Sequence, residues 1–364
     1  MRPLFLAAPP GLEHPCADEA RELGGLADVR AVPGGVECSG DDAALLRANL
    51  ALRVASRVLL PLGDGEARDA ARIARSVDWE AFVAAGGSFS IEIAGGGREP
   101  SRFERPLRDA ILRRVPSARQ VDGAADATFR ARIDGGRISL SADASGAHLH
   151  QRGYRQETGA APLRENLAAG ILRLAGYDGS VPLLDPMCGS GTFLIEGALA
   201  ALRKAPGSAR SFACESWPSL RAGVAEEVRA ELRAAERDAP SCPILGSDRN
   251  AGALGVARRN ATRAGVLPSI SLVRRDVAEL APPPDVSPGV LVANPPYGKR
   301  VGEARELGAL YRSFGQRLRE GFAGWICAVL VADRELGALL ALPDPEQVPL
   351  RNGGIPCTLL LARL

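Results

Sequence analysis

The chain has 364 residues, 46% of them hydrophobic and 24% charged, which is the composition of a folded protein of two or three domains and excludes a disordered or fibrous chain. The formal net charge is only +2, so charge averaged over the whole chain does not indicate a nucleic-acid binder. Lysine is nearly absent, since the 45 basic residues include only Lys204 and Lys299 besides arginines.

The sequence predicts no membrane anchor, no disulfide framework and no zinc site. No stretch approaches 18 uninterrupted apolar residues, and the short apolar run at the N-terminus is too rich in proline for a signal peptide. The seven cysteines are scattered and never spaced as Cys-x2-Cys, which argues against a disulfide framework and a zinc site. We therefore expect a cytoplasmic protein without a metal.

In chain order, the first 42 residues predict a small strand–helix–strand unit. Apolar runs indicate strands over 4–7 and 29–36, the second ending at a Pro-Gly-Gly turn, with a helix over 16–23 between them. Apolar residues then recur at helical spacing over 42–59. Residues 89–93 alternate as a strand that stops at the glycine run 95–97.

The middle of the chain predicts a helix and a hairpin. Pro106 suits the first turn of a helix, and the buried stripe of that helix is formed by Leu107, Ile111, Leu112 and Val115. Strands over 127–133 and 137–142 flank an Asp-Gly-Gly turn. Between Arg98 and Arg164, 13 arginines face 8 acidic residues, a surplus of +5. This surplus is either a solvated surface in an arginine-rich protein or a face that contacts phosphates, and we favour the second interpretation.

After about Pro162 the sequence alternates between strands and helices, which predicts a doubly wound α/β sheet. The predicted strands are 181–184, 243–246, 269–274, 289–293, 325–331 and 357–362, and the predicted helices are 192–203, 251–263 and 303–320. Residues 205–241 are rich in Arg, Glu and Ala and form a predicted helical insertion between the first helix and the second strand.

The segment from Leu183 to Phe193 carries the strongest chemical signal. An apolar strand ends in Asp185, a turn with Gly189 and Gly191 follows, and a helix begins. Such a turn lets the backbone approach a ligand at the carboxyl end of a strand. No lysine follows Gly191, so the turn is not a phosphate loop, and a nucleoside without phosphates is favoured.

Two further acids sit at predicted strand ends. Asp248 follows the second strand and could accept hydrogen bonds from both ribose hydroxyls, while Asp276 follows the third and could accept one from an adenine amine. Either acid alone could be a helix cap. Because both fall in register with the glycine turn, we predict an adenosine site.

The fourth strand runs into Asn294-Pro295-Pro296-Tyr297. The Asn294 side-chain oxygen and the Pro295 carbonyl could take both hydrogens of a planar amino group and stabilise the positive charge that develops as its nitrogen attacks an electrophile. Tyr297 offers a ring on which an unstacked base could lie.

Asp185 to Thr192 and Asn294 to Tyr297 resemble motifs I and IV of class I S-adenosylmethionine-dependent methyltransferases that modify exocyclic amines. Residues 52–63, 77–79, 148–155 and 161–169 extend the likeness over nearly the whole chain. Together these stretches are similar to the THUMP-containing ribosomal RNA methyltransferases of the RlmL type, which form N2-methylguanine in 23S ribosomal RNA.

The resemblance implies a role for each motif residue. Asp185, Cys188, Gly189 and Gly191 would line the methionine end of S-adenosylmethionine, Asp248 would hold its ribose, and Asp276 its adenine. Pro186, Thr192 and Val277 complete the expected cofactor site. Asn294, Pro295, Pro296 and Tyr297 would form the catalytic site for the guanine. The long interval created by the 205–241 insertion leaves Asp248 the least secure of these assignments.

The resemblance also implies the domain organisation. The fold class is α/β, with a doubly wound, Rossmann-like class I methyltransferase domain preceded by an α+β ferredoxin-like and THUMP region. We expect a ferredoxin-like unit over 1–42, an RNA-binding THUMP domain over 43–151, a linker over 152–165, and the methyltransferase domain over 166–364. A second methyltransferase domain, which makes 7-methylguanine in some relatives, is not expected.

Other chemistries fit the residue types less well. Methylation of a pyrimidine carbon needs a cysteine nucleophile, but neither Pro-Cys dipeptide, Pro15-Cys16 or Pro356-Cys357, comes directly after the fourth strand. The common ribose-methylating site needs two well-placed lysines. His148 and His150 lack a third metal ligand nearby. The expected partner is RNA, with 23S ribosomal RNA first and transfer RNA second. A non-catalytic RNA-binding or assembly protein is a weaker alternative, DNA is disfavoured, and the oligomeric state stays open.

Overall fold

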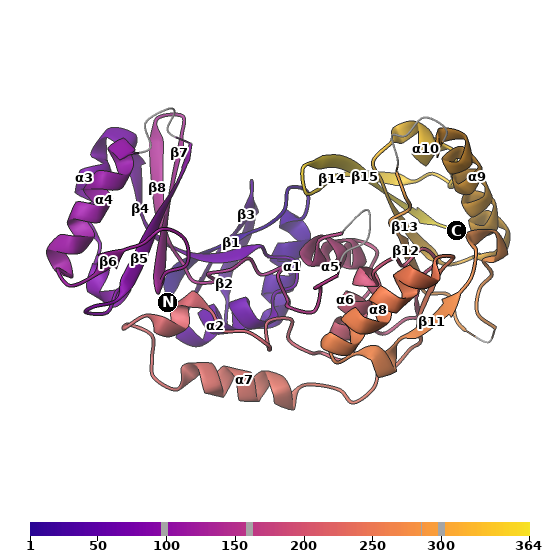
Figure 1. Cartoon of the computed structure of the whole chain (residues 1–364), viewed down its shortest axis with the longest axis horizontal. Coiled ribbons are helices and arrows are strands. Elements are labelled where there is room, and N and C mark those ends of the chain that lie inside the picture. Colours follow the sequence, from indigo (N-terminus) through magenta and orange to yellow (C-terminus); the bar gives the residue numbers. More distant parts are fainter. Residues whose placement is uncertain (96–100, 158–162, 285, 298–302) are drawn as a thin grey trace. The chain divides into compact units, whose positions relative to one another are not determined.

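The computed structural model describes residues 1–95, 101–157, 163–284, 286–297 and 303–364 (Figure 1). Parts of the predicted glycine run at 95–97, of the linker and of the stretch 161–169, together with Lys299, lie outside the described residues. The chain divides into two compact units, which are described separately. The first comprises Met1–Ala8, Cys16–Leu149 and Arg210–Glu231, and the second comprises Pro9–Pro15, His150–Ala209 and Leu232–Leu364.

An eight-stranded sheet forms the first unit, in the order β2-β3-β1-β4-β8-β7-β5-β6. Its strands are β1 (Arg2–Ala7), β2 (Ala27–Val32), β3 (Gly35–Gly40), β4 (Arg57–Glu66), β5 (Ser88–Gly95), β6 (Arg119–Gln120), β7 (Ala127–Asp134) and β8 (Arg137–Asp143). The helices are α1 (Glu13–Leu23, whose first three residues group with the second unit), α2 (Asp42–Ala51), α3 (Ala70–Ser76) and α4 (Ser101–Arg114). β5 runs parallel to β6 and β7, and the other neighbouring pairs are antiparallel.

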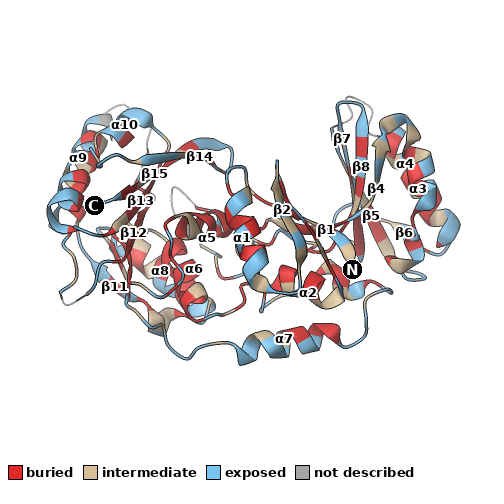
Figure 2. Ribbon diagram, turned by 180° about the vertical axis from the view of Figure 1, so that it is seen from behind, coloured by how far each residue is buried: buried red, intermediate tan, exposed pale blue. Residues whose placement is uncertain are grey.

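One face of this sheet is buried, because apolar side chains occupy every second position of its strands. Leu4 and Leu6 on β1 are at most 2% exposed, and Figure 2 shows buried residues on the strands and helices of this unit. Phe129 on β7 meets Trp79 edge to face with 4.8 Å between ring centroids. The predicted hairpin is confirmed as β7 and β8.

Three predictions for the first unit are wrong. Pro106 does not lie in the first turn of its helix, because α4 begins at Ser101 and Pro106 lies inside it. Residues 29–36 are not one strand, because Gly34 has a φ of +85° and turns the chain between β2 and β3. Gly35 is required beside this turn, since a Cβ there would lie 2.2 Å from the Leu6 carbonyl oxygen. The helix predicted from apolar spacing over 42–59 is too long, because α2 ends at Ala51. Beyond that end, the Glu19 carboxylate accepts the backbone N–H groups of Arg53 at 2.8 Å and Val54 at 3.0 Å.

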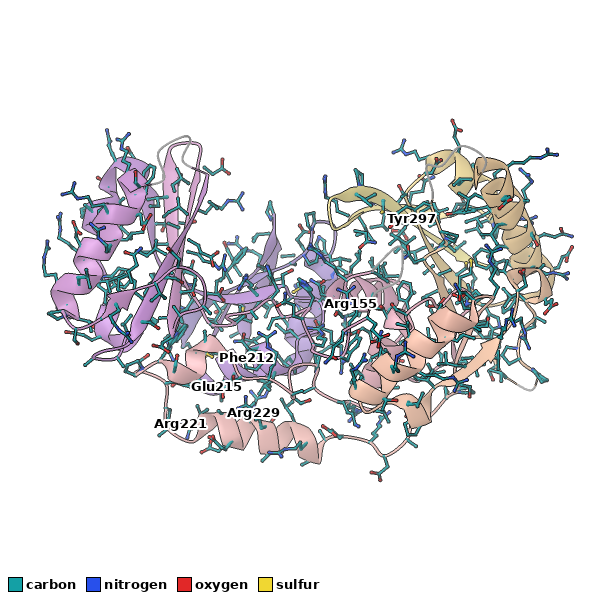
Figure 3. The ribbon with its side chains drawn as sticks, in the orientation of Figure 1. Arg155, Phe212, Glu215, Arg221, Arg229 and Tyr297 are labelled. Carbon is teal, nitrogen blue, oxygen red and sulfur yellow. The ribbon has the colours of Figure 1, made fainter. Side chains whose placement is uncertain are left out.

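Part of the predicted insertion packs within the first unit (Figure 3). The guanidinium of Arg210 donates to the carbonyls of Ala147 and His148 at 2.7 Å each and lies over the ring of Phe212. Arg229, on α7 (Val224–Ala234), binds both oxygens of Glu215 at 2.8 Å. The helical character predicted for residues 205–241 is confirmed by α7, while the domain boundaries stay a prediction.

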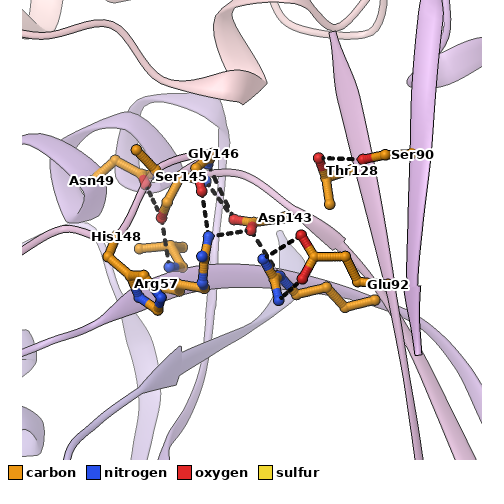
Figure 4. Close-up of polar contacts among 12 residues, drawn as sticks. Asn49, Arg57, Ser90, Glu92, Thr128, Asp143, Ser145, Gly146 and His148 are labelled. Atoms are coloured by element: carbon orange, nitrogen blue, oxygen red, sulfur yellow. Dashed lines mark hydrogen bonds and ion pairs between the residues drawn. The ribbon is translucent and has the colours of Figure 1, made fainter. Parts of the chain in front are cut away.

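A fully buried carboxylate, Asp143 at the end of β8, organises the polar side chains of the first unit (Figure 4). Its Oδ2 accepts hydrogen bonds from Arg57 at 2.5 Å and Arg130 at 2.8 Å, and its Oδ1 accepts the backbone N–H groups of Ser145 and Gly146. One carboxylate thus holds two guanidinium groups and a turn, in surroundings where an ion pair is little screened.

Replacing Asp143 by alanine should lower the free energy of unfolding of the first unit by about 3–5 kcal/mol, because Arg57 and Arg130 would lose their buried counter-charge. Urea unfolding followed by circular dichroism measures the loss. Asp69→Ala is the matched control, since Asp69 pairs with Arg72 at the surface and should cost at most about 1 kcal/mol. Equal losses for the two variants would contradict the organising role.

A seven-stranded mixed sheet forms the second unit, in the order β11-β10-β9-β12-β13-β15-β14. The strands are β9 (Leu183–Asp185), β10 (Ile244–Asp248), β11 (Ser271–Arg274), β12 (Val290–Ala293), β13 (Ile326–Val331), β14 (Glu346–Asn352) and β15 (Ile355–Arg363). The main helices are α5 (Glu165–Leu174), α6 (Thr192–Ala201), α8 (Ala251–Arg263), α9 (Glu303–Gly321) and α10 (Arg334–Ala338). β15 runs antiparallel to both of its neighbours, β13 and β14, and the other neighbouring pairs of this sheet are parallel.

The predicted doubly wound α/β arrangement is confirmed. All six predicted strands occur, and the strand missed by the sequence is β14. A core of buried aromatic and aliphatic side chains, including Phe314, Phe322 and Trp325, packs α9 against the sheet. The strand order reverses beside β9, which places a crevice at its carboxyl end, where open sheets of this kind bind ligands. None of the helices in the described ranges combines the length and apolar character needed to cross a membrane.

Candidate active site

A cavity of about 600 Å³ lies at the carboxyl ends of β9, β10, β11 and β12, within the size range of small-molecule sites. Ten of the residues predicted for the site line it: Asp185, Pro186, Cys188, Gly189, Thr192, Asp248, Asp276, Val277, Asn294 and Pro296. The register explains this gathering, since Asp185 pairs with Gly246 of β10 while Leu184 pairs with Leu291 of β12.

The glycine turn after β9 needs its glycines. Gly189 has a φ of +52° and Gly191 a φ of +83°, which side chains rarely tolerate. A Cβ on Gly191 would also lie 3.1 Å from the Cβ of Ala257 on α8. The backbone of the turn therefore faces the cavity at Gly189. Gly191 does not line the cavity and instead is the N-cap residue of α6.

Asp185 is the most buried acid of the cavity, at 2% exposure. Its Oδ1 accepts the backbone N–H of Met187 at 3.1 Å. Burial raises the pKa of the Asp185 carboxyl well above its ordinary value, and the charge of Asp248 raises it further, against the hydrogen bond from Met187. Within the described residues, no arginine or lysine pairs with Asp185, so its carboxylate suits a cationic group of a ligand.

Asp248 and Asp276 stand at the ends of β10 and β11. Asp248 accepts the N–H of Gly189 at 2.9 Å and that of Asn250 at 2.8 Å, so it ties the glycine turn to the start of α8. Asp276 accepts the N–H of Ala278 at 2.9 Å. The insertion does not displace Asp248, because β10 pairs directly with β9.

The chain after β12 is held from two sides. The hydroxyl of Tyr311, on α9, donates to the Pro296 carbonyl at 3.4 Å. The side-chain amide of Asn352, on β14, donates to the Tyr297 hydroxyl at 3.2 Å, and Figure 3 labels Tyr297 near this strand. Asn294 and Pro296 line the cavity, whereas Pro295 and Tyr297 do not.

Several cavity residues were missed by sequence reasoning. Leu163, Phe193, Val256 and Leu310 contribute apolar surface to its wall. Leu163 lies in a stretch that carries the resemblance and Phe193 ends the segment with the strongest chemical signal, but neither received a role. Val256 and Leu310 lie outside every motif. Asn250 could have been found, because an Asn before a helix is a capping signal, and its side chain accepts the N–H groups of Gly252 and Ala253.

Cys188 lines the cavity as an inert thiol. Burial raises its pKa, and the charges of Asp185 and Asp248 raise it further. A thiol kept protonated in this way is a poor nucleophile, which agrees with the expectation that no cysteine carries the chemistry.

Two family models match separate parts of the chain. Residues 152–360 match the family described as "RMKL-like, methyltransferase domain", and residues 3–59 match the "RlmL ferredoxin-like domain". A Synechocystis protein described as a candidate RNA methyltransferase is 34% identical over 371 residues, covering 99% of this chain and 96% of that protein. The ribosomal RNA large subunit methyltransferase K/L of Marinobacter nauticus is 38% identical over 98% of this chain, which spans about half of that relative, 52% of its length.

Solved structures agree with the fold. The candidate methyltransferase SMU.472, crystallised with SAH (S-adenosylhomocysteine), superposes with a TM-score of 0.89 at 26% identity, over 100% of this chain and 98% of that one. A Listeria monocytogenes protein described as a predicted N6-adenine-specific DNA methylase gives a TM-score of 0.88 at 28% identity, over 99% and 96%. The predicted class I methyltransferase fold is thereby confirmed.

Proposed function

We propose that this chain, which belongs to the RMKL-like methyltransferase family, transfers a methyl group to the exocyclic N2 amine of a guanine in 23S ribosomal RNA. The cofactor is S-adenosylmethionine, whose demethylated product SAH is bound by the similar protein SMU.472. The observation that carries the proposal is the placement of Asn294, from an amine-methylating tetrapeptide, in the same cavity as the glycine turn and Asp185.

The residues that line the cavity support a role for each part of the cofactor. S-adenosylmethionine supplies the electrophilic methyl group. Asp185 would accept a hydrogen bond from the methionine ammonium group, and the backbone at Gly189 leaves room for the methionine chain. Asp248 would accept from the ribose hydroxyls and Asp276 from the adenine amine, with Val277 beside the adenine ring.

The catalytic role falls to the residues after β12. The Asn294 side-chain oxygen and the Pro295 carbonyl would each accept one hydrogen of the guanine amine and thereby orient its nitrogen toward the methyl group. As the nitrogen gains positive charge, these acceptors are already in place and need no reorganisation. Proton loss can follow the attack, so no strong general base is required beforehand.

Tyr297 would provide a surface for the extruded guanine, and its ring matters more than its hydroxyl. Tyr297→Ala should raise KM for RNA about 10- to 100-fold, since stacking on an aromatic ring contributes roughly 1–3 kcal/mol per base. Tyr297→Phe keeps the ring, loses only the hydrogen bond from Asn352, and should change KM less than about threefold. Steady-state kinetics with labelled cofactor decide; similar KM values for the two variants would argue against stacking.

RNA as the substrate rests on the relatives and on the N-terminal half. The Synechocystis and Marinobacter proteins carry descriptions as RNA and ribosomal RNA methyltransferases. We propose that residues 43–151 form a THUMP domain that binds RNA, and that the protein acts in the cytoplasm, where ribosomal RNA is found.

Labelled methyl transfer to separate substrates tests the proposal. Purified protein is incubated with protein-free 23S ribosomal RNA, assembled large subunits, transfer RNA and duplex DNA, and the products are digested to nucleosides. We expect N2-methylguanine from ribosomal RNA. N2-methylguanine from transfer RNA alone would keep the proposed reaction but make transfer RNA the substrate. Methylated adenine in DNA would contradict both the proposed reaction and the RNA substrate. RNA binding without any methylated product would favour a non-catalytic role.

A further inference from the structure

We propose that two arginines on the rim of the cofactor cavity, Arg249 and Arg275, bind backbone phosphates of the substrate RNA. Arg249 directly follows Asp248 at the end of β10, and Arg275 directly follows β11. Both residues line the cavity and are exposed. This inference rests on the proposed function, because it assumes an RNA substrate.

The two residues are held close together by the sheet. β10 and β11 are parallel neighbours in which Asp248 pairs with Arg274. The N–H of Arg275 donates to the Asp248 carbonyl at 3.2 Å, and Nε of Arg274 donates to the Arg249 carbonyl at 3.1 Å. Two adjacent loops therefore present their guanidinium groups at one edge of the cavity.

Among the described residues, the positive charge of this rim is not neutralised by ion pairs. Within the described residues, no carboxylate lies within ion-pair distance of Arg249, Arg274 or Arg275, although such pairs are common elsewhere in the chain. For comparison, Arg259 and Arg263, both on α8, form ion pairs with Glu157 at 2.6 Å and 2.7 Å. Arg258, which donates to the Leu272 carbonyl of β11, adds a fourth positive charge against the carboxylates of Asp248 and Asp276.

The cofactor does not explain this charge. S-adenosylmethionine carries a sulfonium, an ammonium and a carboxylate, so its net charge is +1, and a positive rim works against its binding. It also has no phosphate for a guanidinium to grip. The one anionic group of the cofactor, its carboxylate, belongs to the methionine end that we place at Asp185 and Gly189, whereas Arg249 and Arg275 follow the acids that we place at the ribose and the adenine. The rim therefore suits another anion, and an RNA whose guanine enters the cavity supplies backbone phosphates. Arginine forms bidentate pairs with phosphate.

The test compares Arg249→Gln/Arg275→Gln with a control that removes the same charge elsewhere in the second unit, Arg317→Gln/Arg363→Gln. RNA affinity is measured by fluorescence anisotropy over a series of salt concentrations, and cofactor affinity by calorimetry. The rim variant should bind RNA about 10- to 100-fold more weakly at 0.1 M salt. The slope of log affinity against log salt should fall by about one to two, since each phosphate contact to single-stranded RNA contributes roughly 0.7.

Two further measurements separate the possible failures. Arg249→Lys/Arg275→Lys keeps the charge and should retain most of the salt slope, which guards against a folding defect in the glutamine variant. Wild-type methyl transfer to RNA is measured first, because its absence would overturn the proposed function. If the wild type methylates RNA but the rim and control variants share one RNA affinity and one slope, the phosphate-binding role is overturned. A loss confined to cofactor affinity would overturn it as well.

Discussion

Asn294→Ala should reduce the rate constant for methyl transfer by about 10²- to 10³-fold, the loss typical of removing one preorganised group that stabilises charge in a transition state. Asn294 follows β12 directly and lines the cofactor cavity, so its oxygen can accept a hydrogen of the target amine. Single-turnover transfer of a labelled methyl group measures the chemical step apart from product release.

The control for Asn294→Ala is a variant that keeps an acceptor in the same place. Asn294→Asp has nearly the same shape and should be at least tenfold faster than Asn294→Ala. RNA affinity and cofactor affinity should change less than about threefold in Asn294→Ala, because the interaction acts mainly in the transition state. If alanine is tolerated, or if both variants lose only binding, Asn294 has no catalytic role.

The sequence was sufficient to predict the methyltransferase half, because its signals are local. Each parallel strand there is a short apolar run followed by a turn and a helix, and the acids Asp185, Asp248 and Asp276 occur at strand ends. Asp248 came into register despite the long insertion, since pairing between β9 and β10 depends on their own side chains and not on the length of the connection.

The errors arose where tertiary contacts override a local pattern. Residues 52–59, the second part of the stretch predicted as helical, fit helical spacing, but pairing of β4 with β1 and β8 keeps residues from Arg57 onward extended. β14 has few apolar residues to mark it as a strand, and it exists because it pairs with β15. Since β14 was missed, so was Asn352 and its hydrogen bond to Tyr297.

The rim arginines could not have been singled out in a sequence whose basic residues are nearly all arginine. Nothing in the sequence distinguishes Arg249 from Arg259. The structure shows that Arg259 pairs with Glu157, whereas Arg249 lines the cofactor cavity. Ion pairing depends on which side chains the fold brings together. The local surplus between Arg98 and Arg164 is a weaker guide, because Asp143 and Glu92 bind Arg130 within it.

Asp185→Asn should weaken S-adenosylmethionine binding about 100-fold and yet stabilise the free protein. The affinity falls because a buried carboxylate that pairs with an ammonium group contributes several kcal/mol, and a neutral amide contributes far less. The stability rises because the wild-type carboxylate is buried without a cation among the described residues, a cost that the amide avoids while its oxygen still accepts the Met187 N–H.

The pH dependence of Asp185 follows from the direction of its pKa shift. The folded pKa lies above the value of the unfolded chain, mainly through burial, so this group favours the folded state below the unfolded pKa. That contribution is lost as pH rises through the folded pKa. The melting temperature of the free wild type should therefore decline over that range relative to Asp185→Asn, whereas its affinity for cofactor should increase as the carboxyl ionises.

Thermal unfolding and calorimetry across this pH range, with and without cofactor, test both halves of the Asp185 prediction. Asp276→Asn is the matched control, because Asp276 is less buried and its carboxylate caps a short helical turn, so it should lose about tenfold or less in affinity and gain no stability. If Asp185→Asn binds S-adenosylmethionine as tightly as the wild type, Asp185 does not bind the ammonium group. A lower melting temperature of Asp185→Asn at every pH would show that the carboxylate stabilises the fold. A variant that is more stable than the wild type but cannot bind cofactor would show that the buried carboxylate lowers stability and is needed for cofactor binding.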